Sequence, residues 1–128
     1  MAVATDLREM ILQAIDNASD ELVVLAKRIH ANPEVAFQEV QASKWLTETL
    51  ERRGFKVERG VADLPTAFRA EVPGKGSEPV VALLAEYDAL PEIGHACGHN
   101  LICTAALGAG IGLAAAMKQL PGRALVFG

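Results

Sequence analysis

The residues best suited to chemistry lie between positions 85 and 100 of this 128-residue chain. This segment holds four acidic or thiol side chains and two imidazoles: Glu86, Asp88, Glu92, Cys97, His95 and His99. Carboxylate, thiolate and imidazole are the groups by which proteins bind divalent ions of the zinc or manganese type. Cys97 and His99 stand two positions apart, and the glycine between them allows the backbone to fold closely around an ion. The segment is therefore predicted to form a metal site.

Residue types alone leave a second interpretation of this pair open. A single cysteine before an apolar helix is usually a small buried hydrophobe, and a single histidine is usually a hydrogen-bonded polar group. His30, far from the cluster in sequence, is expected to have a structural role. On types and spacing alone, Cys97 and His99 are either ligands or structural residues.

Two helices are predicted before this segment. Apolar residues recur at helical spacing over 7–29 until Asn32-Pro33 ends the pattern, and residues 17–20 could interrupt it. A second helix is predicted over 38–53, with Gly54 as its end. Its inward residues are expected to be Val40, Trp45, Leu46 and Leu50.

Strands are predicted over 55–58, 66–72, 80–85 and 124–127. The second and third are separated by a turn at 73–77 and are expected to pair with each other. Residues 80–85 and 124–127 are continuous apolar runs, typical of strands covered on both faces. The apolar stretch 101–120 between them is either a buried crossover helix or a membrane span, and its link between two strands favours the crossover. The pattern is that of an α/β protein.

Composition excludes several functional classes. A net charge of −4 and a pI near 5.3 argue against a nucleic-acid-binding surface, which needs a surplus of Lys and Arg. The first residues lack the apolar segment of a signal peptide, so we expect a cytoplasmic protein without a membrane partner. Two cysteines, Cys97 and Cys103, stand six positions apart across a helix start, which does not favour a disulfide.

Four motifs carry a resemblance to a known family: RIHANPEVAFQE at 28–39, LERRGFKV at 50–57, EYDALP at 86–91 and HACGHN at 95–100. In this order they resemble the M20 family of metal-dependent peptidases and amidohydrolases, in the amidohydrolase-like branch with aminobenzoyl-glutamate hydrolases and small dipeptidases. The resemblance implies a partial α/β/α sandwich of the zinc-exopeptidase type, truncated after about the fourth strand. Residues 1–128 would be the amino-terminal portion of the catalytic domain, without its remainder and without the inserted dimerisation domain.

The resemblance also assigns roles to residues. Cys97 and His99 match metal ligands of a paired site that holds two divalent ions, zinc or manganese, in a complete enzyme. Asp88 matches an acid that accepts a hydrogen bond and orients a ligand. The general base, a glutamate, is expected after Gly128 and is therefore absent from this chain. The possible site-lining residues are His95, Glu86 and Asn100.

Two of these lining positions raise questions of their own. Glu86 stands where the better-known branch of the family has a histidine ligand, which leaves the role of Glu86 open. Asn100 stands where many relatives carry an aspartate, and its amide can cap the following helix but adds no charge. His95 is expected either to line the site or donate a hydrogen bond there, or to serve only the loop.

The function implied is hydrolysis of the amide bond of a small dipeptide or N-acyl amino acid, with this chain inactive alone. The full-length parent is expected to form a homodimer. The alternative is a small stand-alone α/β module that binds a metal or a partner protein without catalysis. In either case an unpaired sheet edge would favour self-association of the chain.

Overall fold

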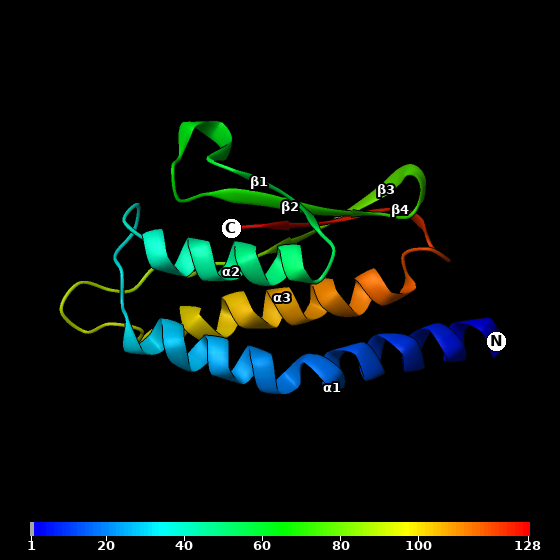
Figure 1. Cartoon of the computed structure of the whole chain (residues 1–128), viewed down its shortest axis with the longest axis horizontal. Coiled ribbons are helices and arrows are strands. Elements are labelled where there is room, and N and C mark those ends of the chain that lie inside the picture. The colour runs from blue at the N-terminus through cyan, green and yellow to red at the C-terminus, as the bar shows by residue number, and fades with distance from the viewer. Residues whose placement is uncertain (1) are drawn as a thin grey trace.

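The computed structural model describes residues 2–128 and has three long helices and one four-stranded sheet. The elements, in chain order, are α1 (Ala2–Ala31), α2 (Val40–Arg52), β1 (Lys56–Arg59), the short 3-10 helix η1 (Val61–Asp63), β2 (Phe68–Pro73), β3 (Lys75–Leu84), α3 (His99–Ala116) and β4 (Pro121–Phe127). Figure 1 shows α2 and α3 against one face of the sheet and α1 on the far side of α3. The α/β class is confirmed, and α1 is continuous through residues 17–20.

The sheet has the strand order β1-β2-β4-β3. β4 is parallel to β3 and antiparallel to β2, and α3 is the crossover between the parallel pair. The expected pairing of 66–72 with 80–85 is wrong, because β4 lies between them. The turn after β2 bonds to the start of β4 instead: the Gly74 amide donates to the Gly122 carbonyl at 2.8 Å, and the Lys75 amide donates to the Leu120 carbonyl at 2.8 Å.

α3 is the central helix of the fold. By length and composition it would suit a membrane span, yet 56% of it is buried within the protein, between α1 and the sheet. Small residues permit this close packing. A β-carbon at Gly110 would lie 2.9 Å from Val126 Cγ2 of the sheet, and one at Gly112 would lie 3.0 Å from Ile15 Cδ1 of α1. The prediction of a buried crossover helix is confirmed.

β3 differs from its prediction as a strand covered on both faces. It is an edge strand, and the exposed fractions of Val80, Val81 and Leu84 are 38%, 48% and 68%. In Figure 1 the helices cover one face of the sheet, and within residues 2–128 no element covers the other. Residues 2–128 therefore place helices on one face of a sheet, with the apolar residues of β3 at a solvent-exposed edge.

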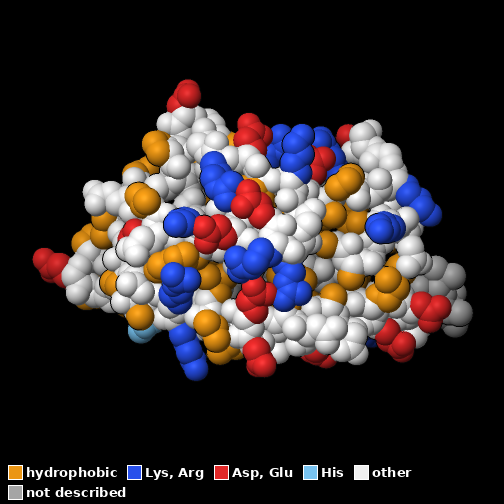
Figure 2. Space-filling model, viewed as in Figure 1, with side chains coloured by type: hydrophobic (Ala, Val, Ile, Leu, Met, Phe, Trp, Pro, Cys, Tyr) orange, Lys and Arg blue, Asp and Glu red, His pale blue; other side chains and the backbone are white. Residues whose placement is uncertain are grey.

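Charged side chains of both signs are interleaved on the surface. Figure 2 shows Lys and Arg next to Asp and Glu across this face. Examples are Glu21 with Arg52 at 3.0 Å and Arg59 with Glu51 at 2.6 Å. Such exposed pairs contribute little to stability, but their mixture leaves this face without the basic surface that a nucleic-acid partner would require.

The buried face of α2 supplies a test of the core. Leu46 and Leu50 are fully buried, as predicted, whereas Val40 is 67% exposed, because it is the first residue of the helix and lies outside the core. Leu46→Ala is expected to lower the free energy of unfolding by about 2–5 kcal/mol. Val40→Ala, the control on the same helix, should change it by less than about 0.5 kcal/mol. Urea denaturation measures both, and equal losses would contradict this packing.

Candidate metal site

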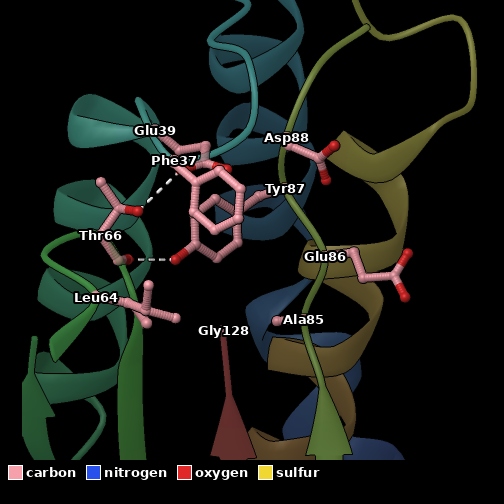
Figure 3. A pocket seen from close by; sticks show the side chains of 10 residues that line it. Phe37, Glu39, Leu64, Thr66, Ala85, Glu86, Tyr87, Asp88 and Gly128 are labelled. Carbon is pink, nitrogen blue, oxygen red and sulfur yellow. Dashed lines mark hydrogen bonds between the residues drawn. The ribbon is translucent and has the colours of Figure 1, made fainter. Parts of the chain in front are cut away.

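The chain leaves β3 at the carboxyl end of the parallel strand pair and stays extended. The Ala85 amide donates to the Phe127 carbonyl at 2.7 Å, which holds this extension beside β4. Because alternate residues of an extended chain point to opposite sides, Glu86 and Asp88 share one side and Tyr87 takes the other. Figure 3 shows the two carboxylates projecting toward α3 and the Tyr87 ring projecting away from it.

A tight loop then returns the chain to α3. Leu90 and Gly94 exchange backbone hydrogen bonds of 2.9 and 3.1 Å. Gly98 precedes the helix with φ of +83°, a conformation that favours glycine. His99 is the first residue of α3, so the crossover places its imidazole at the carboxyl end of the parallel strands, where open α/β sheets bind ligands.

His99 lies between two carboxylates. Its Nδ1 is 2.7 Å from Asp88 Oδ1 and 3.0 Å from the Asp88 carbonyl oxygen. A carbonyl oxygen only accepts, so Nδ1 carries the proton and donates it. The ring's other nitrogen, Nε2, lies 3.1 Å from Glu86 Oε2. The imidazole is thus held by Asp88 with Nε2 left as the nitrogen that can bind an ion.

The accessibility of these groups rises from His99 outward. The side chains of His99, Asp88 and Glu86 are 20%, 32% and 59% exposed. In the described part of the chain, however, no three His, Cys, Asp or Glu side chains converge as a complete metal site. The residues here offer a partial set of ligands.

Cys97 lies on the surface of the loop and has a free thiol. No hydrogen bond joins it to His99 among residues 2–128, and its role as a ligand stays a prediction. Cys103 is different: it is fully buried in α3, and its thiol lies 3.4 Å from the Asn100 carbonyl. Burial raises the pKa of Cys103 to about 12. The absence of a disulfide agrees with the sequence prediction.

This contrast makes Cys97 testable by alkylation. With iodoacetamide at neutral pH, Cys97 should be modified and Cys103 should not, because only an accessible thiolate reacts. If Cys97 binds metal, zinc should slow its modification, and mass spectrometry of the peptides measures this directly. Modification of Cys97 at the same rate with saturating zinc would remove it from the ligand set.

His95 is buried and stacks on His30 of α1, with ring centroids 6.2 Å apart. Neither ring nitrogen of His95 has a hydrogen-bond partner in the residues described, so the expected donation is not observed. Burial, with the nearby imidazoles of His30 and His99, lowers the pKa of His95. The structure therefore brings His30 to the loop, although its distance in sequence gave no sign of this.

Asn100 does not cap α3. The N-cap position is Gly98, and no side-chain hydrogen bond caps the helix there. Asn100 is buried, and its Nδ2 donates to the Ala26 carbonyl of α1 at 3.3 Å. Its amide therefore links the two helices, because the residue already lies inside the first turn of α3 and faces α1.

Two acids that sequence reasoning passed over help to fix the site. The Glu34 carboxylate accepts hydrogen bonds from the Gln41 and Ala42 amides at the start of α2, and its carbonyl accepts one from Ala89 at 2.7 Å. Glu39 is buried and accepts a hydrogen bond from Thr66 Oγ1 at 2.9 Å. Acids near a helix start are common, so no sequence signal marked these two.

A cavity of about 250 Å³ borders the extended segment that follows β3, and its lining includes Glu86 and Asp88. Figure 3 shows its wall of Phe37, Leu64, Thr66 and Tyr87, with Gly128 beside it. The Tyr87 hydroxyl donates to the Thr66 carbonyl, and burial raises the pKa of Tyr87 to about 12. The phenol is thus a neutral structural group at ordinary pH.

Comparison with known proteins shows clear relatives, although no model of a known protein family matches the sequence. The chain is 40% identical over 120 residues to a human Xaa-Arg dipeptidase, covering 85% of this chain and 28% of that protein. It is 36% identical over 131 positions to one of the subunits of p-aminobenzoyl-glutamate hydrolase from Escherichia coli strain K12, covering 89% and 27%.

The fold has a solved counterpart. A dinuclear metal-binding peptidase of the M20 family from Bacillus subtilis superposes with a TM-score of 0.76 at 28% identity, over 84% of this chain and 34% of that one. The chain thus spans between 27% and 34% of the length of these relatives. Sequence motifs, relatives and fold agree, and the chain belongs to the M20 family of peptidases and amidohydrolases.

Proposed function

We propose that this chain forms part of a metal-dependent hydrolase that cleaves the amide bond of a small dipeptide or N-acyl amino acid. The observation that carries the proposal is the orientation of His99, whose Nδ1 donates to Asp88 and whose Nε2 is left beside Glu86. The names of the relatives, a dipeptidase and an aminobenzoyl-glutamate hydrolase, support the substrate class.

The donor groups fit a divalent ion of the zinc or manganese type. His99 offers a nitrogen of fixed tautomer, Cys97 an exposed thiol and Glu86 an exposed carboxylate. Asp88 holds the imidazole by its other nitrogen and fixes its orientation, as carboxylates behind histidine ligands do. A bound ion would polarise the scissile carbonyl as a Lewis acid.

The activity is proposed for a complete enzyme, of which this chain spans the amino-terminal portion of the catalytic domain. In that enzyme we place two divalent ions, a glutamate general base outside residues 1–128, and a homodimer formed through an inserted domain. We also propose a cytoplasmic location.

The test is hydrolysis of p-aminobenzoyl-glutamate and of dipeptides ending in arginine. The complete enzyme should lose turnover in a chelator and regain it with zinc or manganese. The 128-residue chain should show no turnover above a metal-only blank, since general-base assistance alone is typically worth about 10²–10⁴-fold. Chelator-resistant turnover would refute the metal-dependent function, and turnover by the chain that disappears in Cys97→Ala would refute the need for a base elsewhere.

A second candidate is a non-catalytic module that binds a partner or a second copy, and one observation favours it. The outer edge of β3 is unpaired over residues 2–128, and its apolar residues are exposed. Exposed strand edges promote pairing between chains. Sedimentation velocity distinguishes the candidates: a stable dimer of chains that bind no metal would favour the module over the hydrolase.

A further inference from the structure

The position of Glu86 beside His99 assigns a role that the sequence left open. Glu86 Oε2 lies 3.1 Å from His99 Nε2, the ring nitrogen that Asp88 does not occupy. We propose that Glu86 is a metal ligand and that its carboxylate and His99 Nε2 bind one divalent ion together. The inference rests on the metal-dependent function proposed above and adds a ligand to it.

The separation of the two atoms matches two ligands of one ion. Bonds from zinc to imidazole nitrogen and to carboxylate oxygen are each about 2.0–2.2 Å long. At the angles of octahedral and tetrahedral coordination, two such donors lie about 2.8–3.6 Å apart. The observed 3.1 Å falls inside this range, so an ion can bind both atoms with little movement of either side chain.

The backbone explains why Glu86 and Asp88 have different roles. Both project to the same side of the extended strand, two positions apart. Asp88 reaches Nδ1 at 2.7 Å, and Glu86 reaches Nε2 on the other side of the ring. Asp88 therefore orients the imidazole, whereas Glu86 lies where the ion would bind.

Charge and access support the same assignment. With its proton on Nδ1, the imidazole presents a lone pair at Nε2, and a cation bound between this lone pair and the Glu86 carboxylate would offset their repulsion. The Glu86 side chain is 59% exposed, so an ion can reach it from solvent. Its negative charge would offset part of the charge of a divalent ion.

The experiment uses paramagnetic Mn²⁺, which broadens the NMR signals of nearby nuclei even when binding is weak. The ¹⁵N-labelled chain is titrated with Mn²⁺ while the imidazole signals of His99 are followed. In Glu86→Gln the Mn²⁺ concentration that halves these signals should rise at least about tenfold, because losing a ligand costs no less than losing a residue that orients one.

Glu92→Gln is the matched control. Glu92 is exposed on the same loop, has no hydrogen bond or ion pair in the described structure, and loses the same charge. Its midpoint should stay within about twofold of the parent, since an exposed charge that forms no hydrogen bond or ion pair with His99 is screened by solvent and salt. The amide spectrum of each variant verifies that the fold is intact.

The outcomes distinguish a failure of this inference from a failure of the proposed metal-dependent function. If Mn²⁺ broadens His99 equally in Glu86→Gln and Glu92→Gln, Glu86 is only an ionic neighbour of His99, and the inference is wrong while the metal site stands. If Mn²⁺ leaves His99 of the parent chain unaffected, the metal site and the role of Glu86 are both wrong. A shift confined to Glu86→Gln establishes the ligand.

Discussion

His99→Ala is expected to abolish hydrolysis by the complete enzyme and to remove one equivalent of metal. The imidazole is the group whose orientation Asp88 fixes, and no other described histidine has such a partner. Removing a residue that orients a metal ligand typically lowers metal affinity or activity by about 10–100-fold. Removing the ligand itself should therefore lower kcat/KM by more than about 100-fold. Steady-state kinetics and elemental analysis of the purified variant measure both effects.

His30→Ala provides the control for that experiment. His30 is exposed on α1 and stacks on His95, so its loss should affect stability more than the rate constant. Loss of metal from His30→Ala together with full metal content in His99→Ala would mean that the site has been assigned to the wrong residues.

Asp88→Asn is expected to lower metal affinity and activity by about 10–100-fold. The substitution keeps the shape of the side chain but removes the negative charge of the carboxylate. That carboxylate accepts the hydrogen bond from His99 Nδ1, with Oδ1 and Nδ1 2.7 Å apart. Asp20→Asn, an exposed aspartate on α1, is the control for charge alone and should leave both values unchanged. Competition with a chromophoric chelator gives the affinity, and an affinity unchanged in Asp88→Asn would show that the hydrogen bond is structural.

The local elements of the fold could be predicted because their signals are local. Apolar residues at helical spacing located α1 and α2, and Gly54, with φ of +87°, follows α2 as expected. The apolar stretch that became α3 was interpreted correctly because it links two strands in a crossover. Each of these signals lies within one segment of the chain.

Strand order could not be read in the same way. Pairing of β2 with β4 depends on residues far apart in the sequence, such as Ala70 and Val126, which are 56 positions apart, and no local pattern encodes that choice. The apolar run of β3 predicted that both faces of the strand are buried. Burial depends on which elements pack against a strand, and among residues 2–128 none pairs with the outer edge of β3. The prediction that Val40 is buried was wrong for a related reason. Its spacing fits the buried face of α2, but it is the first residue of the helix and lies outside the core.

The residues of the candidate site were identified from the sequence mainly through resemblance. Asp88 and His99 are eleven positions apart, and a contact between them follows only once the loop returns to α3. The family pattern supplied the orienting role of Asp88, and the geometry is consistent with it. The position of Glu86 beside His99 could not be inferred without the structure, because residue type alone does not distinguish a metal ligand from a solvent-exposed acid.

The central claim is that Asp88 holds His99 so that Nε2 binds a divalent ion. Long-range ¹H–¹⁵N NMR of the labelled chain, titrated with zinc, tests it most directly. Nδ1 should remain protonated at every zinc concentration while the Nε2 resonance moves as zinc binds, and Asp88→Asn should weaken that response. Movement of Nδ1 in place of Nε2, or a His99 ring that does not respond at saturating zinc, would contradict the account.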